Sequence, residues 1–352
     1  MNTPSRHTKQ DLAELAHQAM IDKGLEPDFS PAVEKQLAGI SGPAAEPGLP
    51  DLTALLWCSI DNDDSLDLDQ LSVSETLPDG GIKVLVAVAD VDAVVRKGTP
   101  IDDHARANTT SVYTAARIFP MLPERLSTDL TSLNQDENRI ATVIEMVFDR
   151  DASLASSSVS RATVRNKAKL AYDAVSAWLD GQGEPPAPVR AVPGMDAQLK
   201  AQSGIAQKLR ERRHEEGALE FETIQPKAIF EGDQVVDLRE QPQNLARQLI
   251  EEFMIAANGV VARFLQSSGF SSLRRVVRSP ERWGRIVEVA RELGDHLPPE
   301  PDSRALQEFL SRRRRADPDR FPDLSLVIVK LMGAGEYVVE KPGGAPVGHF
   351  GL

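Results

Sequence analysis

An apolar run ends in a dense cluster of acidic side chains near residue 60, and this junction most constrains how the chain can fold. Five aspartates fall within nine positions of the stretch SIDNDDSLDLDQL, residues 59–71: Asp61, Asp63, Asp64, Asp67 and Asp69. Carboxylates this close repel one another, so the cluster does not stabilise the fold by itself. The preceding run LLWCSI has the pattern of a buried strand, and leucines alternate with the aspartates. The sequence therefore predicts an acidic segment that is anchored at the edge of a core and binds positive charge.

Three interpretations of the acidic segment compete. A calcium loop requires glycine at its sixth position and glutamate at its twelfth. Counted from Asp61, those positions hold Leu66 and Ser72, so this interpretation fails twice. An exposed acidic loop without a ligand remains possible. A Mg²⁺ site for phosphodiester cleavage also remains possible, because hard divalent ions prefer carboxylate oxygens and two of them can stabilise both the attacking and the leaving oxygen. Asp61, Asp67 and Asp69 are spaced so that they can converge on such a pair of ions.

The composition is that of a globular protein. A chain of 352 residues can form one large domain or two ordinary ones, and 41% hydrophobic with 26% charged residues argues against general disorder. The single cysteine, Cys58, excludes an internal disulfide framework and fits a reducing compartment. The N-terminus lacks the apolar core of a secretory signal, and the longest apolar stretches are too short to span a bilayer. We therefore expect a soluble, cytoplasmic and monomeric protein.

The net charge of −13 would by itself argue against a nucleic-acid partner, but its distribution changes that interpretation. Residues 1–50 sum to −3, residues 51–150 to −10 and residues 151–352 to zero, and residues 61–70 supply half of the −10. The remainder contains compact basic patches: RATVRNKAK (161–169), KLRERR (208–213), RRVVR (274–278) and RRRR (312–315). An acidic cluster facing basic strips is typical of a metal-dependent enzyme that acts on a polyanion. Each patch alone is equally consistent with a solvated helix face.

Local patterns divide the chain into an N-terminal appendage, residues 1–50, and one large α+β domain, residues 51–352. The appendage is expected to form one amphipathic helix followed by a Pro/Gly-rich linker. The domain begins with strands: LTALLWCSI, a hairpin of DQLSVSET and GIKVLVAVAD around LPDGG, RIATVIEMVFD, and SSVSRATVRNKAKL. Together these patterns predict a mixed β-sheet flanked by helices.

Helices are predicted at residues 195–215, 243–266 and 281–294, and a loop at residues 181–194. The second helix carries an apolar stripe, consisting of Leu245, Leu249, Phe253, Ala257, Val261 and Phe264. This stripe predicts that one side of the helix packs on the sheet.

Several blocks, taken in order, resemble the RNB (ribonuclease II) family of 3′→5′ exoribonucleases. SIDNDDSLDLDQL is similar to the family signature T-I-D-x₅-D-x-D-D, and NTTSVYTAARIFPMLPERLSTDLTSL (108–133) to a block built on PMLP, LS and SL. Further similar blocks are VLVAVADVDAVV (84–95), SRATVRNKAKLAYDAV (160–175), LIEEFMIAAN (249–258) and VGHFGL (347–352). The resemblance runs from about residue 51 to the last residue, and the ordered set is far more specific than any single block. It implies an RNB-type catalytic domain.

The resemblance also implies which residues form the site. Asp61, Asp67 and Asp69 match the first three aspartates of the signature, and are expected to be catalytic and to hold Mg²⁺, or Mn²⁺ in its place, against the scissile phosphate. Single-stranded RNA would then lose nucleoside 5′-monophosphates from its 3′ end. Tyr113 matches a tyrosine that packs against the terminal nucleotide, which suits a non-specific enzyme because every base presents a π-face. A core tyrosine is the alternative for this residue.

Three arginines are expected to contact RNA phosphates: Arg117, Arg274 and Arg275. For each of them an ordinary surface charge is the alternative interpretation.

Two departures from the family pattern bear on catalysis. Gln70 stands where the family has a fourth aspartate, and an amide brings no negative charge, so the metal affinity is expected to fall unless Asp63 or Asp64 substitutes. The chain also ends at VGHFGL, before the family's T-S-P-I-R-R-Y block, so the catalytic domain is expected to be C-terminally incomplete. The main prediction is a Mg²⁺-dependent exoribonuclease. The alternatives are a catalytically inactive RNA-binding remnant of the family and a metal-binding protein without a nucleic-acid partner.

Overall fold

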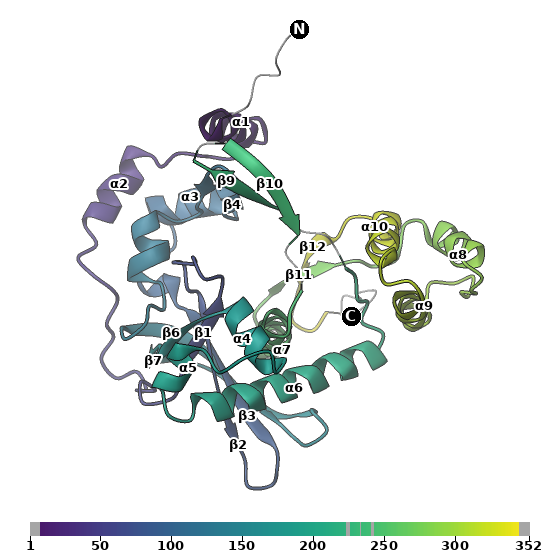
Figure 1. Cartoon of the computed structure of the whole chain (residues 1–352). Coiled ribbons are helices and arrows are strands. Elements are labelled where there is room, and N and C mark those ends of the chain that lie inside the picture. The colour runs from purple at the N-terminus through teal and green to yellow at the C-terminus, as the bar shows by residue number, and fades with distance from the viewer. Residues whose placement is uncertain (1–7, 223–225, 233, 241–242, 345–352) are drawn as a thin grey trace.

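A six-stranded mixed sheet forms the centre of the computed structural model, which describes residues 8–222, 226–232, 234–240 and 243–344 (Figure 1). Its strands, in spatial order, are β7 (Leu154–Arg165), β6 (Asn138–Phe148), β3 (Ile82–Ala89), β2 (Gln70–Thr76), β1 (Cys58–Asp61) and β8 (Ala168–Ala171). Neighbouring strands are antiparallel except β1 and β8, which are parallel. The predicted α+β fold with a mixed sheet flanked by helices is confirmed.

Most strands lie where the sequence predicts them. β2 and β3 form the expected hairpin around LPDGG, in which Gly80 adopts a positive φ of 85° that favours glycine. The predicted strand RIATVIEMVFD is β6, and SSVSRATVRNKAKL contributes to both β7 and β8. β7 ends at Arg165 and β8 begins at Ala168. Between them, the side-chain oxygen of Asn166 accepts from the amide of Ala168 at 3.1 Å and so interrupts the strand.

The prediction of one strand over LTALLWCSI is wrong in its first half. The carboxylate of Asp51 accepts from the amide of Thr53 at 2.9 Å and so starts a turn. The indole of Trp57 then donates to the carbonyl of Leu52 at 2.9 Å, which closes the segment on itself. Regular pairing with β2 and β8 therefore begins only at Cys58.

Helices α4 (Tyr172–Leu179), α6 (Met195–Glu215) and α7 (Leu245–Ser267) cover one face of the sheet (Figure 1). Leu249, Phe253 and Ala257 of α7 are buried against the apolar side chains of that face, as the predicted stripe requires. Near the end of the helix Phe264 is 42% exposed, so the stripe leaves the core there.

The long helix α6 is polar in composition, and buried glutamines bind it to the sheet. The hydroxyl of Ser72 on β2 donates to the side-chain oxygen of Gln202 at 2.9 Å. The side-chain oxygen of Gln198 accepts from the amide of Ser74 at 3.2 Å. These hydrogen bonds explain how a helix with a weak apolar stripe packs closely on a strand.

Loops, not helices, cover the opposite face of the sheet. The core on this side consists of Trp57, Leu68, Leu71, Val73, Leu85, Ala87, Leu133, Ala141, Val143, Ala162 and Val164. Leu68 and Leu71 come from the acidic segment itself. The expectation that this segment is anchored at a core edge is therefore confirmed.

The N-terminal appendage contains two helices, α1 (Lys9–Asp22) and α2 (Pro31–Ala38), where one was predicted. The missed helix begins at strong signals, because Ser30 caps it through its side chain and Pro31 fills the first position. Val33 of α2 packs with Ile101 of α3 (Pro100–Asn108) and with Leu126. The appendage is thus joined to the block that contains PMLP.

The remaining elements are short, apart from a group of three helices. They are the helical turns η1 (Val91–Ala93) and η2 (Arg125–Leu130), the ribbons β4 (Val112–Tyr113) with β5 (Ile118–Phe119), β9 (Pro226–Glu231) with β10 (Gln234–Glu240) and β11 (Ser272–Val276) with β12 (Glu336–Glu340), and the helix α5 (Ala187–Ala191). The last of these lies inside the predicted loop 181–194, which is therefore not wholly irregular. VGHFGL lies outside the described residues.

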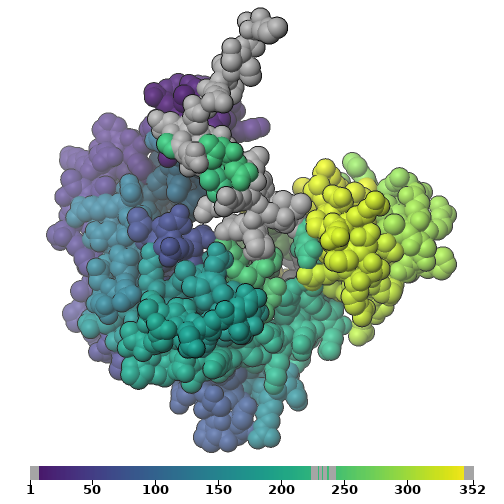
Figure 2. Space-filling model, in the orientation of Figure 1, coloured from purple at the N-terminus to yellow at the C-terminus, as the bar shows by residue number. Residues whose placement is uncertain are grey.

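Helices α8 (Trp283–Glu292), α9 (Ser303–Ala316) and α10 (Phe321–Met332) form a lobe beside the main body (Figures 1 and 2). The lobe has its own apolar core, in which Trp283, Phe309 and Ile328 are buried. The predicted helix at 281–294 is confirmed as α8, followed by Gly294 at a positive φ.

Glu220 joins the lobe to the body through charge. Its carboxylate accepts from Arg210 of α6 and from Arg314 of α9. Its amide donates to the side-chain oxygen of Gln307 at 2.8 Å. Nearby, Arg213 of α6 forms a two-point ion pair with Glu252 of α7, with distances of 2.6 and 3.1 Å. No helix within the described ranges is long and apolar enough to cross a membrane.

Replacement of one core side chain of α7 is expected to show how much of the stability this layer supplies. Phe253→Ala should lower the free energy of unfolding by about 3–5 kcal/mol, because a fully buried ring is lost and a cavity remains. Phe264→Ala on the same helix removes the same ring from a partly exposed position and should cost less than about 1 kcal/mol. Urea unfolding followed by circular dichroism measures both, and equal losses would contradict the packing described.

Candidate active site

Asp61 is the last residue of β1, so its position in the site is fixed by the sheet. β1 lies between β2 and β8, and Asp61 pairs with Ala171 directly before Tyr172 begins α4. One carboxylate oxygen of Asp61 accepts from the amide of Asn62 at 2.6 Å and from the hydroxyl of Ser65 at 2.9 Å. These bonds turn the chain out of the strand and into the acidic segment.

The acidic segment is held by the SL part of the PMLP block. The amide of Leu68 donates to the hydroxyl of Ser132 at 3.0 Å, and this hydroxyl donates to the carbonyl of Leu66 at 2.8 Å. The amide of Leu133 donates to the carbonyl of Leu68 at 2.8 Å. Two blocks that lie far apart in the sequence therefore form one local structure. Asp67 and Asp69 flank the pinned residue Leu68.

Tyr113 reaches the acidic segment from the short ribbon of β4 and β5. Its hydroxyl donates to a carboxylate oxygen of Asp67 at 2.9 Å, while its side chain stays 64% exposed. Desolvation of the phenol, the hydrogen bond to Asp67 and the nearby charges of Asp69 and Asp61 raise the pKa of Tyr113 to about 12. The phenol therefore remains a donor at neutral pH, and its ring is open to solvent. The alternative of a core tyrosine is excluded.

Asp69 shares its electrostatic environment with the other two aspartates. Desolvation by the surrounding protein, followed by the charges of Asp61 and Asp67, raises the pKa of the Asp69 carboxyl to about 6. The Asp69 residue as a whole is exposed. Neighbouring atoms and two like charges nevertheless crowd its carboxyl, and both effects disfavour the charged form. Such a site favours a cation.

Gln70, at the fourth signature position, contacts the backbone of β1. Its side-chain amide donates to the carbonyl of Ile60 at 3.5 Å. Asp63 and Asp64 lie at exposed positions of the loop.

Sequence reasoning missed three residues beside Asp61. Arg247, in the first turn of α7, donates to the side-chain oxygen of Asn62 at 2.8 Å. Its guanidinium carbon lies 4.4 Å from the centre of the Tyr172 ring. Desolvation and the charge of Asp61 raise the pKa of Tyr172 to about 12. Tyr172 lies within LAYDAV, so the ordered blocks contained the signal for it, whereas Arg247 stands two residues before the block LIEEFMIAAN.

The donor chemistry of the three aspartates fits a hard divalent cation, although their arrangement is not a closed ligand shell. Among the described residues, no three His, Cys, Asp or Glu side chains are placed closely enough to hold a metal ion. The physical reason lies in the hydrogen bonds above, since Asp61 is directed to Asn62 and Ser65 and Asp67 to Tyr113. The three carboxylates therefore do not form one closed ligand set among the described residues, and their role as metal ligands stays a prediction.

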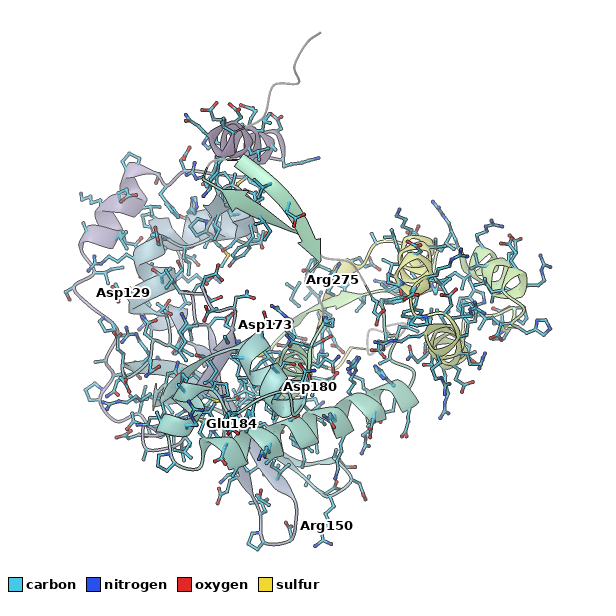
Figure 3. All side chains as sticks on the ribbon, viewed as in Figure 1. Asp129, Arg150, Asp173, Asp180, Glu184 and Arg275 are labelled. Carbon is cyan, nitrogen blue, oxygen red and sulfur yellow. The ribbon has the colours of Figure 1, made fainter. Side chains whose placement is uncertain are left out.

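The three arginines expected to contact RNA have different environments. Arg117 faces Asp28 at 3.7 Å and the ring of Phe119, with its guanidinium carbon 4.6 Å from the ring centre. Arg274 is paired with Glu340 at 2.7 Å. Arg275 is exposed, and Figure 3 shows it on the β11–β12 ribbon, between the body and the helical lobe. None of the three joins the acidic group directly in the contacts described for this part of the chain.

Comparison with protein families and curated proteins identifies consistent relatives. A family model described as the RNB domain matches residues 50–352. Ribonuclease R of Escherichia coli is 34% identical over 332 residues, which are 91% of this chain and 39% of that protein. Exoribonuclease 2 of Escherichia coli is 30% identical over 306 residues, or 86% of this chain and 46% of that protein. The chain thus spans less than half the length of these curated relatives.

Solved structures show the same fold. RNase R of Mycoplasma genitalium, in complex with ribose-methylated single-stranded RNA, superimposes with a TM-score of 0.81 at 24% identity and covers 94% of this chain and 51% of that one. Yeast Ssd1, described as a pseudonuclease, gives a TM-score of 0.68 at 16% identity and covers 88% of this chain and 38% of that one. At these identities the likeness shows the fold alone.

Loss of the Ser132 hydroxyl is expected to loosen the acidic segment. Ser132→Ala leaves the Leu68 amide and the Leu66 carbonyl without this partner, and should lower the free energy of unfolding by about 1–3 kcal/mol. Hydrogen exchange at Leu68 should also become faster. Ser127→Ala is the control, because it removes a hydroxyl from the same block whose exposed hydrogen bond goes to the carbonyl of Glu124 and not to the acidic segment. Unchanged exchange at Leu68 would show that the serine does not hold the segment.

Proposed function

The chain belongs to the RNB domain family, and from that premise we propose that it is a hydrolytic 3′→5′ exoribonuclease that shortens single-stranded RNA. The observation that carries the proposal is the convergence of Asp61, Asp67, Asp69 and Tyr113, drawn from two separate sequence blocks, in one acidic and partly desolvated site. An exposed aromatic ring beside carboxylates combines a surface for a base with a site for the cation that a phosphate requires.

The reaction adds water across the terminal phosphodiester bond. The phosphorus–oxygen bond to the 3′ oxygen of the preceding nucleotide breaks, and that oxygen takes up a proton. The phosphate stays with the released nucleotide as a 5′-monophosphate, and the shortened RNA keeps a 3′-hydroxyl. Asp61, Asp67 and Asp69 would hold Mg²⁺, and the bound ion would neutralise charge on the scissile phosphate and acidify water.

The chain's own side chains position the substrate. The ring of Tyr113 stacks on the terminal base, and its hydroxyl bond to Asp67 fixes the ring relative to the carboxylates. Arg247 donates to the side-chain oxygen of Asn62, the residue after Asp61, and holds it in place. Stacking without base-specific hydrogen bonds accounts for an enzyme that accepts any sequence.

A second candidate function is an RNA-binding protein without hydrolytic activity. Gln70 favours it, because the fourth signature position has no charge and its amide is directed to the backbone of β1. The two functions share the binding site and differ in whether the remaining carboxylates suffice for catalysis. A cytoplasmic location and a monomeric state remain predictions from the sequence.

Hydrolysis should depend on the carboxylate of Asp69 and not on the total number of acidic side chains in the segment. Asp69→Asn is expected to abolish Mg²⁺-dependent trimming of a 3′-labelled single-stranded RNA, while RNA binding stays intact or becomes tighter because repulsion of the phosphate falls. Asp64→Asn removes the same charge from an exposed position and should retain most of the activity. Binding without trimming by the unaltered chain, in either Mg²⁺ or Mn²⁺, would favour the second candidate.

Divalent cation binding offers a test that does not require activity. Titration calorimetry with Mn²⁺ should show an affinity at least about tenfold lower for Asp69→Asn than for the unaltered chain, because a carboxylate ligand is lost. Gln70→Asp should raise the affinity by adding the missing charge. If Asp64→Asn weakens binding as much as Asp69→Asn does, the whole acidic loop attracts the ion and the three aspartates do not form a defined site.

A further inference from the structure

The two-stranded ribbon of β11 and β12 separates its side chains into two unlike faces. In its antiparallel register Leu273 lies opposite Val339, and Arg275 lies opposite Tyr337. Side chains two residues apart on a strand share a face, so these four side chains project together. On the opposite face Ser272, Val276 and Glu340 are buried, whereas Glu336 is exposed. We refer to Leu273, Arg275, Tyr337 and Val339 as the exposed ribbon face.

The exposed ribbon face leaves much apolar surface in contact with water. Tyr337 and Leu273 are each 68% exposed, and Val339 is 60% exposed. A scattered apolar side chain on a surface needs no explanation, but a contiguous group of three marks an interaction site. We therefore expect a ligand to cover the exposed ribbon face, and the side chains of this face indicate the chemical class of that ligand.

The three arginines of the RRVVR patch differ in whether they form ion pairs. Arg274 is paired with Glu340 at 2.7 Å on the buried side of the ribbon. Arg278 is paired with Glu336 at 2.8 Å. Arg275 has no ion-pair partner among the described residues, and it is the arginine that shares a face with Tyr337. The positive charge available to a ligand is thus concentrated beside the exposed ring.

The guanidinium of Arg275 lies across Gly335, two residues before Tyr337 on β12. A Cβ at Gly335 would lie 3.4 Å from the Nε atom and 3.5 Å from the central carbon of that guanidinium. These are ordinary contact distances, so the guanidinium of Arg275 packs on the backbone at Gly335, directly before the start of β12.

We propose that the exposed ribbon face binds one nucleotide of single-stranded RNA, with its base stacked on Tyr337 and its phosphate held by Arg275. A π-face beside an unpaired guanidinium is the combination that recognises a nucleotide without reading its sequence. Leu273 and Val339 pack against the edge of the base. The negative charge of a phosphate complements Arg275, whereas the apolar core of a protein interface would leave it buried and unpaired.

The site is separate from the acidic group. α7 runs between the two regions, because its first turn carries Arg247 beside Asn62 and its C-terminal end leads into β11. The bound nucleotide thus belongs to the upstream part of a strand whose 3′ end is the substrate. The inference rests on the proposed function for the identity of its ligand, but it requires binding only and no hydrolysis.

The test measures the affinity for a single-stranded oligouridine that carries one 2-aminopurine, in EDTA so that no trimming occurs. Tyr337→Ala should weaken binding by about five- to a hundredfold and reduce the stacking-dependent quench of the 2-aminopurine. Tyr337→Phe keeps the ring and should bind like the unaltered chain. This rescue separates stacking from a general effect on the ribbon, and thermal unfolding confirms that each variant is folded.

The charge on Arg275 is tested through the salt dependence of binding. Arg275→Gln should weaken binding and make the slope of log affinity against log salt concentration shallower by about 0.7, because one phosphate contact is lost. Arg278→Gln is the matched control, since it removes the same charge from the same ribbon at a position already paired with Glu336. It should leave the slope unchanged.

Three results would overturn the inference. The first is an unaltered chain that does not bind the RNA, and the second is Tyr337→Ala and Arg275→Gln variants with undiminished affinity and slope. The third is a dimer in sedimentation experiments that Tyr337→Ala dissociates, which would assign the face to a second copy of the chain. A chain that binds through Tyr337 but trims nothing in Mg²⁺ would overturn the proposed hydrolysis and support the ribbon site.

Discussion

The pairing of Leu68 with Ser132 and Leu133 is the interaction on which the candidate site depends. Repulsion among five carboxylates favours an extended, solvated loop. Against it act the backbone hydrogen bonds of Leu68 and the burial of its side chain under the sheet. Because the side chains on either side of Leu68 are Asp67 and Asp69, fixing one residue fixes both carboxylates. The bond from Tyr113 to Asp67 requires the same fixed loop.

Local patterns in the sequence predicted the parts of the fold whose causes are local. The β2–β3 hairpin was predictable because LPDGG supplies the turn, and α7 because its apolar residues recur at helical spacing. The turn of residues 51–57 was not, since it depends on one side-chain bond from Asp51 that competes with a strand-like apolar run. The helix α2 was missed although Ser30 and Pro31 mark its start. In the site, the order of the family blocks located Asp61 and Tyr113, but the contact between Arg247 and Asn62 joins residues far apart in the chain, which no local pattern encodes.

The basic patches show how charge counts alone mislead. Arg210 and Arg213 of KLRERR are bound by Glu220 and Glu252, and Arg314 of RRRR shares Glu220. These arginines connect helices and are not available to a polyanion, so neither the polyanion interpretation nor the alternative of a solvated helix face holds for them. The burial of such pairs makes each partner costly to remove, while the net gain from the pair is small. An interpretation of the sequence as basic strips therefore has to be corrected residue by residue, according to which cations keep a free face.

The ribbon of β11 and β12 also bears on the order in which the protein can fold during its synthesis. β12 is synthesised only after residues 277–335, which contain the whole lobe. At ordinary rates of translation the synthesis of these residues takes roughly 3–12 s, during which β11 has not yet met the strand with which it pairs in the described structure. An unpaired strand of this kind invites pairing with other nascent chains, and charged residues are the usual protection. Arg274 and Arg275 lie in the middle of β11, so their charges oppose pairing with other chains before β12 is synthesised. In the folded protein Arg274 then pairs with Glu340, whereas Arg275 has no ion-pair partner among the described residues.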